Sequence, residues 1–206
     1  MNARWLLPLA MVAAVGFSAA PRAQQPTPCL LVPTPSTRLS SDSTPAGRVT
    51  FLGGGVLLRC PDRGITLRGD SAEQYPDHDY MVGNSVYDEP RFHVTSDYLN
   101  YYPGTDIVKA VGNVVARMHD GSTLRGPYAE YRRPLKGTRP HEQMYAISRP
   151  TIDIVQQDTV KKGATDTTVV IANQVFMDGD SLIYAGGDVV ITRPEITATA
   201  DSSFID

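Results

Sequence analysis

Short apolar runs, separated every few residues by Gly, Pro, Asp or Asn, fill the chain from Arg48 onward. Tyr, Val, Ile and Thr dominate these runs, and beyond the first 23 residues only a weak stretch at 156–162 has helical spacing of apolar positions. Such residues between turn-forming residues are typical of short strands and tight turns. The pattern therefore predicts an all-β protein.

A ten-residue unit occurs twice, as Gly64–Glu73 and again as Gly121–Glu130, with seven identical positions at one constant offset. The preceding runs, Gly54–Cys60 and Gly112–Met118, also align, one residue out of phase with the later match. The slip falls in the intervening turn, where length changes are tolerated. A weaker third copy begins at Gly187–Thr192 and continues into Glu195 and Ile196. We predict a repeated strand-turn-strand unit.

Alternate side chains of a strand share a face, which assigns the apolar positions of these units to one inner surface. Two D-x-L-x-Y motifs, Asp97–Tyr101 and Asp180–Tyr184, add a leucine each. If the units stack, the inner surface is continuous. Its predicted members are Val56, Leu58, Leu67, Leu99, Val114, Ala116, Met118, Leu124, Leu182, Val189, Ile191 and Ile196. Without further information, such residues are expected simply to pack on one another.

The N-terminus has the features of a secretory signal. Arg4 precedes an apolar run, and Pro21-Arg22-Ala23 supplies a small residue at a plausible cleavage point. The run is shorter than a membrane-spanning helix requires. We expect residues 1–23 to be a cleavable signal peptide, 24–47 a linker rich in Pro, Ser and Thr, and 48–206 one β domain in the periplasm.

Charge and cysteine content narrow the classes of function. Cleavage after Ala23 would leave 206 − 23 = 183 residues with a formal charge of 17 − 22 = −5. Without a basic stripe, the chain is not expected to bind nucleic acid. Cys29 and Cys60 are a candidate disulfide in an exported chain, although spacing alone leaves bridged and free thiols both open. The pair lacks the spacing of a zinc site.

No motif predicts catalysis, a metal site or a cofactor. Asp77-His78-Asp79 looks like a ligand cluster, but consecutive strand residues point to opposite faces, so a solvated loop is the better interpretation. Glu73 and Glu130 could form a glycosidase-like pair, yet matched repeat positions favour an outward ladder or turn role. We therefore expect no enzyme.

These motifs together resemble the OstA-like (LptA-type) family of lipopolysaccharide-transport proteins. The resemblance rests on the two D-x-L-x-Y motifs, on the glycine-containing strands Ala110–Val114 and Ala185–Val189, and on the L-R-G-x-x-A-E units that end at Glu73 and Glu130. It covers most of residues 48–206. Residues 134–168 fit neither repeat, and the chain ends partway through what looks like a third unit.

The resemblance implies an open, twisted β-jelly roll of stacked antiparallel strands whose interior holds acyl chains. It further implies transport of lipopolysaccharide or a related glycolipid to the outer membrane, with other OstA-like proteins joined end to end by strand pairing. Two alternatives stay open. One is an envelope docking module that pairs by its strand edges and binds no lipid. The other is a β-solenoid enzyme acting on polysaccharide.

Overall fold

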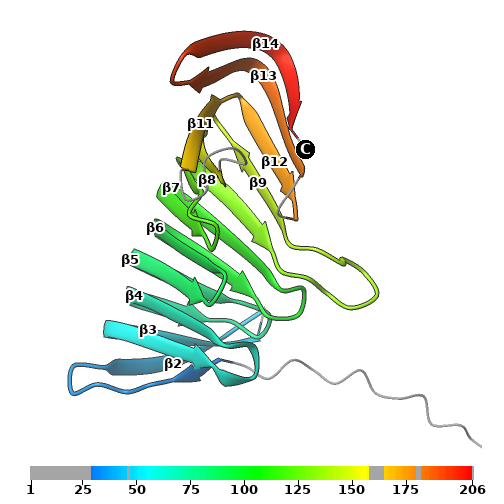
Figure 1. The fold of residues 1–206 in the computed structure, drawn as a ribbon. Coiled ribbons are helices and arrows are strands. Elements are labelled where there is room, and N and C mark those ends of the chain that lie inside the picture. The colour runs from blue at the N-terminus through cyan, green and yellow to red at the C-terminus, as the bar shows by residue number, and fades with distance from the viewer. Residues whose placement is uncertain (1–28, 46, 158–164, 180–181, 206) are drawn as a thin grey trace, which may run out of the picture.

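The computed structural model describes residues 29–45, 47–157, 165–179 and 182–205, and it confirms the predicted all-β, jelly-roll-like architecture (Figure 1). The strands are β1 (Leu30–Leu31), β2 (Arg38–Thr44), β3 (Gly47–Cys60), β4 (Ile65–Gln74), β5 (Asp79–Glu89), β6 (Phe92–Tyr102), β7 (Ile107–Met118), β8 (Thr123–Arg132), β9 (Gln143–Ile147), β10 (Thr151–Gln157), β11 (Thr165–Ile171), β12 (Gln174–Asp178), β13 (Leu182–Arg193) and β14 (Ile196–Ile205). A short 3-10 turn, η1 (Pro61–Arg63), joins β3 to β4.

The strands from β3 to β8 form an antiparallel meander in chain order, stacked one on another in Figure 1. At β8 the sheet divides. Residues 123–125 of β8 pair with β10, whereas residues 128–132 pair with β9. β10 continues to β11 and β9 to β12, and both branches rejoin on β13. The pairing therefore closes into a ring through these six strands, and β14 adds to β13 as the last strand.

The long strands bend in the middle, so the sheet has two arms. Arm 1 contains β1, β10 and β11; arm 2 contains β2, β9 and β12; the long strands cross both. Each long strand passes from one arm to the other at a shift in its pairing register. These register shifts lie at Gly53/Val56, Arg68/Ser71, Val82/Ser85, Thr95/Tyr98, Val111/Val114 and Gly186/Val189. Bulges of this kind bend a strand and increase its twist.

Glycine followed by Asn or Asp makes several of these bends. Gly112 and Asn113 both have positive φ angles, of 77° and 47°, and a Cβ on Gly112 would lie 2.4 Å from Asp97 Oδ2. Only glycine fits both demands there. Asn113 Nδ2 donates a hydrogen bond of 2.9 Å to Asp97 on the neighbouring strand. Similar bonds join Asn84, at the bend of β5, to Asp70 of β4, and Asn173, just before β12, to Asp188 at the bend of β13. Side-chain hydrogen bonds therefore support several of the bends.

The repeated sequence unit corresponds to a pair of strands. Its first copy forms β3 and β4, and its second copy forms β7 and β8, four strands later. The one-residue difference in length between the copies falls in the connecting turn, as predicted. The predicted linker is partly wrong, however. Residues 30–31 and 38–44 form strands paired to β3, so the domain begins before Arg48. The Ser and Thr residues of 38–44 do adopt the expected extended conformation, but backbone hydrogen bonds join this segment to the sheet.

Candidate functional site

The interior between the arms is lined by an unbroken lateral row of apolar side chains on arm 1. Each member is the direct cross-strand partner of the next, so all share one face. The row runs through Leu31, Leu58, Leu67, Tyr87, Val94, Ala116, Leu124, Ile152, Val170, Ile191 and Ala198. At about 4.8 Å per strand the row extends over roughly 48 Å.

Arm 2 presents an inner row of smaller side chains. It runs through Leu52, Ala72, Met81, Leu99, Ala110, Ala129, Ala146, Val175 and Ala185. Apart from Ala198, which is exposed, the members of both rows belong to one hydrophobic cluster or, for Leu31 and Ile191, pack against it. Five of the nine residues in this row of arm 2 are alanine. Where the two arms meet, aromatic side chains also contact one another, as Tyr87 of arm 1 does with Tyr101 and Tyr131 of arm 2. The interior is therefore filled by the protein's own side chains.

Most of the predicted inner residues do face this interior. Those buried in the core are Val56, Leu58, Leu67, Leu99, Val114, Ala116, Leu124 and Val189. Met118 and Ile191 are partly buried and pack against it. The position of these side chains was thus predictable, whereas their contact with lipid stays a prediction.

Leu182 corrects the sequence analysis. It pairs with Asp178, while the next residue, Ile183, pairs with Met177 and is buried. Leu182 therefore lies on the outer face, because Ile183 takes the inner position. The two D-x-L-x-Y motifs are consequently not equivalent, since Leu99 is fully buried.

Ile196 also differs from expectation. It pairs with Arg193 in register with the inner row, but its side chain is 66% exposed. β14 is the last strand on this side of the sheet in the described chain, so no further strand covers it. The sequence analysis therefore assigned Ile196 to the correct face of its strand, but this side chain is not buried as expected.

A seam of charged residues joins the free ends of the two arms. The β5–β6 and β8–β9 connections would lie on opposite edges of a flat sheet, roughly 35 Å apart for strands of this length. Here Arg133, after β8, donates to Glu89, at the end of β5, with an Nε–Oε2 distance of 2.7 Å. Arg91 Nη2 likewise donates to Glu142 Oε1 at 3.0 Å. The sheet therefore folds over on itself, and these ion pairs join its two opposite edges.

The seam continues toward the N-terminal strands. Arg63 Nη1 donates to the Tyr101 hydroxyl at 2.8 Å, and its Nε lies 3.6 Å from Asp106 Oδ1. Arg133 also reaches Asp106 at 3.3 Å and the carbonyl oxygen of Arg63 at 3.1 Å. Arg133 thus contacts three separate turns, with its side chain only 20% exposed and that of Glu89 only 5%. Together, these hydrogen bonds and ion pairs hold the free ends of the two arms together along this part of the interior.

An aromatic layer lies beneath the charges. Phe92 and Tyr131 stack with centroids 3.9 Å apart, and Tyr87 lies 5.9 Å from Tyr101. Burial raises the pKa of Tyr87, Tyr101 and Tyr131, so their hydroxyls stay neutral. Among the described side chains, the Tyr87 hydroxyl is a buried polar atom without a hydrogen-bond partner.

The N-terminal end of the interior opens to solvent. A cavity of about 750 Å³ lies between Cys29–Leu31 on one side and residues 74–79 and 103–104 on the other. Asp79 faces it from the inner side and is only 5% exposed. Burial raises the pKa of Asp79, while a hydrogen bond from Gln74 at 2.9 Å partly offsets the shift. This is the one acidic group at the mouth that sequence reasoning placed in a solvated loop and the structure buries.

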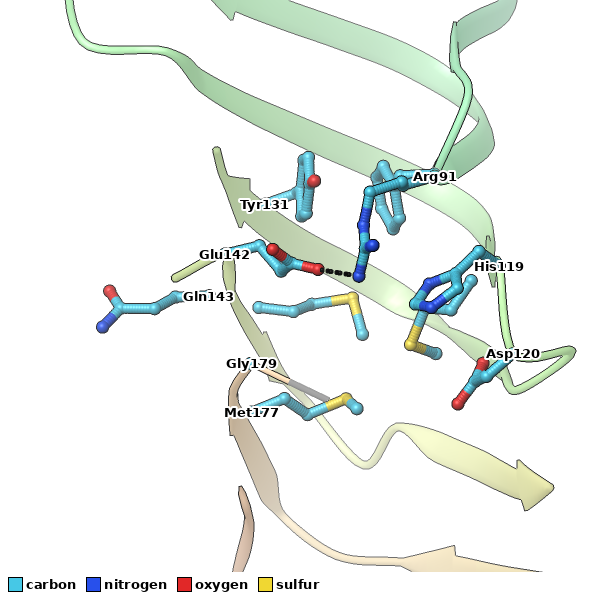
Figure 2. A pocket seen from close by; sticks show the side chains of 11 residues that line it. Arg91, His119, Asp120, Tyr131, Glu142, Gln143, Met177 and Gly179 are labelled. Carbon is cyan, nitrogen blue, oxygen red and sulfur yellow. Dashed lines mark hydrogen bonds and ion pairs between the residues drawn. The ribbon is translucent and has the colours of Figure 1, made fainter. Parts of the chain in front are cut away.

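A second, smaller cavity lies in the seam, with a volume of about 40 Å³ (Figure 2). The ion pair of Arg91 with Glu142 spans one side of it, and His119 and Asp120 stand at the other. Its apolar lining includes Phe92, Tyr131 and three methionines, Met118, Met144 and Met177.

Other candidates from the sequence separate in space. Glu73 and Glu130 both face outward, as expected, and lie four strands apart, roughly 19 Å at the usual strand spacing. That is too far for a paired-carboxylate mechanism. Glu130 instead accepts hydrogen bonds from Arg132 and Tyr128. Burial, and after it the nearby Glu130 carboxylate, raises the pKa of Tyr128 to about 12.

Cys29 and Cys60 form a disulfide that fastens β1 to the end of β3. In the described part of the chain, no group of three or more His, Cys, Asp or Glu side chains is arranged to hold a metal ion. Nor does that part contain a helix long and apolar enough to cross a membrane. The predicted signal peptide lies outside the described residues.

Sequence reasoning missed the seam. Arg63, Glu89, Asp106, Arg133 and Glu142 all lie in or beside turns, where charged residues ordinarily indicate solvent exposure. The one feature of the sequence that could indicate the seam is that these charged residues lie at alternate strand ends. That placement predicts contacts between them only once the bend of the sheet is known.

A scan against protein-family models finds no match to this sequence, and a search of curated proteins finds none.

Proposed function

We propose that this protein is a periplasmic carrier that shields the acyl chains of lipopolysaccharide, or of a related glycolipid, on the way to the outer membrane. The observation that supports this function most directly is the unbroken apolar row from Leu31 to Ala198. A row across the strands matches an elongated apolar ligand, and each CH₂ removed from water contributes about 0.8 kcal/mol.

The packing suggests how acyl chains enter. Chains occupying the interior must take the place of contacts between the two arms, among them those of Tyr87 with Tyr101 and Tyr131. The cavity at the N-terminal mouth offers the entrance, because it is large and open to solvent. Separation of the arms then admits the chains along the inner row.

Photocrosslinking tests this function with a matched pair of sites on β13. Ile191 and Val190 are adjacent and both half-buried, but Ile191 packs against the core and Val190 faces outward. A photoreactive residue at position 191 should crosslink to lipopolysaccharide in cells, and one at 190 should not. Equal yields at the two positions, or no glycolipid adduct at 191 and no bound lipid by native mass spectrometry, would refute lipid carriage.

A docking module is the second candidate, and the exposed edges of the sheet favour it. Leu39 on β2 is 63% exposed, and Phe204 on β14 is 62% exposed. Apolar residues on edge strands are suited to pairing with a further strand. Other OstA-like transport proteins are the partners we propose. Crosslinks from positions 39 and 204 to protein, together with none to glycolipid from 191, would favour docking alone.

A further inference from the structure

Methionine is concentrated at one point in the molecule. Beyond residues 1–23 the sequence has four methionines, Met81, Met118, Met144 and Met177, and the last three line the seam cavity. Met118 comes from the end of β7 on arm 1, whereas Met144 and Met177 come from β9 and β12 on arm 2. The cavity therefore gathers thioethers from both arms.

The backbone brings two of these side chains together directly. Met144 and Met177 are cross-strand partners on one face. Directly opposed residues have Cβ atoms about 4.5–5.5 Å apart, so flexible Met side chains can bring their sulfurs to a common point. Both are nearly inaccessible, with 4% and 7% of their surface exposed. The third, Met118, is half-buried and continues into His119 at the rim.

Size and charge are compatible with a bound ion. The cavity volume of about 40 Å³ exceeds the roughly 10–15 Å³ that a cavity needs to hold one water molecule, so a metal ion has room there. The charged lining residues are Arg91, Asp120 and Glu142, with a formal sum of +1 − 2 = −1. Glu142 is already paired with Arg91. The lining therefore favours a small monovalent cation.

Thioether sulfur is a soft ligand that selects Cu(I) over hard cations, and imidazole also suits copper. We propose that the seam cavity is a binding site for a soft monovalent metal ion, Cu(I) or Ag(I). The sulfurs of Met118, Met144 and Met177 hold the ion, and the His119 imidazole completes the site from the solvent side. His119 is exposed, which gives the ion a path from solvent. The site goes beyond lipid carriage and does not depend on it.

The competing explanation is that methionine simply fills irregular space in a core, a common use of this side chain. Met81 provides the internal comparison, since it is fully buried in the inner row of arm 2 and does not line the cavity. A packing role predicts no metal binding at all. A metal site predicts that Met81 and the three cavity methionines behave differently.

Silver(I) is the probe, because it is soft and does not oxidise in air. In calorimetry and native mass spectrometry the intact protein should bind one Ag(I), and an equal concentration of Zn²⁺ should not displace it. Methionine and leucine are close in volume, so Met144→Leu, Met177→Leu and the control Met81→Leu should all fold. Loss of an outer-sphere partner already weakens metal binding 10–100-fold, so loss of a direct ligand should weaken it by at least about tenfold.

The methyl resonances of the wild-type protein give a test that needs no variant. Addition of Ag(I) should shift the ε-methyl signals of Met118, Met144 and Met177 and leave that of Met81 in place. His119→Gln should also weaken binding, with the same three signals responding at higher silver concentration. Absence of one-to-one binding, equal affinity of Met144→Leu and Met81→Leu, or displacement by Zn²⁺ would overturn the proposal.

Discussion

The ion pair between Glu89 and Arg133 should be a strong contact between the two arms. Its atoms are 2.7 Å apart, which gives an attraction of about 6 kcal/mol at an effective dielectric constant of about 20. Desolvation of both ions offsets part of this attraction. Arg133→Gln leaves the Glu89 carboxylate buried without its cation, so we expect a loss of about 3–5 kcal/mol in the free energy of unfolding.

Urea denaturation of a double-mutant cycle measures the coupling. Glu89→Gln with Arg133→Gln should cost less than the sum of the single changes, with a coupling energy of at least about 1.5 kcal/mol. The control is the pair of Arg125 with Asp153, at 2.5 Å, whose side chains are 53% and 29% exposed. That exposed pair should couple by no more than about 1 kcal/mol. If both cycles give the same small coupling energy, the ion pair of Glu89 with Arg133 does not hold the two arms together.

Three further predictions concern stability. Removing the disulfide by Cys29→Ala with Cys60→Ala frees a loop with a sequence separation of 31, so the free energy of unfolding should fall by about 3–4 kcal/mol, measured by chemical denaturation. Unchanged stability would contradict it. Leu124→Ala in the inner row should cost about 2–5 kcal/mol, whereas Leu39→Ala on the exposed edge should cost less than about 0.5 kcal/mol. Comparable losses would place Leu124 outside the core. Asp79 has a raised pKa, so the folded state holds its proton more tightly than the unfolded chain does, and stability falls as pH rises through the folded-state pKa. Asp79→Asn should therefore be more stable than the parent at pH 7 and lose that advantage below the unfolded-chain pKa, near 3.8, in urea titrations. An advantage independent of pH would refute this.

The repeat and the inner face could be predicted because they are local. Alternation within a strand assigned Leu67 and Leu124 to the interior without knowledge of any partner strand, and both are fully buried. The same reasoning failed at Leu182, where two apolar residues in succession, Leu182 and Ile183, compete for the inner position. Composition misled at residues 38–44, since Ser and Thr suit an edge strand as well as a linker.

The seam and the methionine cavity could not be predicted, because they depend on how far the sheet bends. Arg133 and Glu89 are 44 residues apart in the chain, and no pattern in either neighbourhood refers to the other. Met118 and Met177 likewise look like ordinary strand residues in the sequence. Their meeting follows from the bend at Gly112 and the bends at corresponding places of the neighbouring strands, whose geometry a single sequence does not express.

The seam also has a consequence for the order of folding. Hairpins such as β5–β6 join residues close in the chain and can form early, whereas the contact of Arg63 with Arg133 spans 70 residues. Loop closure of that length costs entropy before the contact returns any free energy. Closure of the seam should therefore come after the folding barrier. Seam variants such as Arg133→Gln would then accelerate unfolding and leave the folding rate nearly unchanged, so these charges set the lifetime of the closed form.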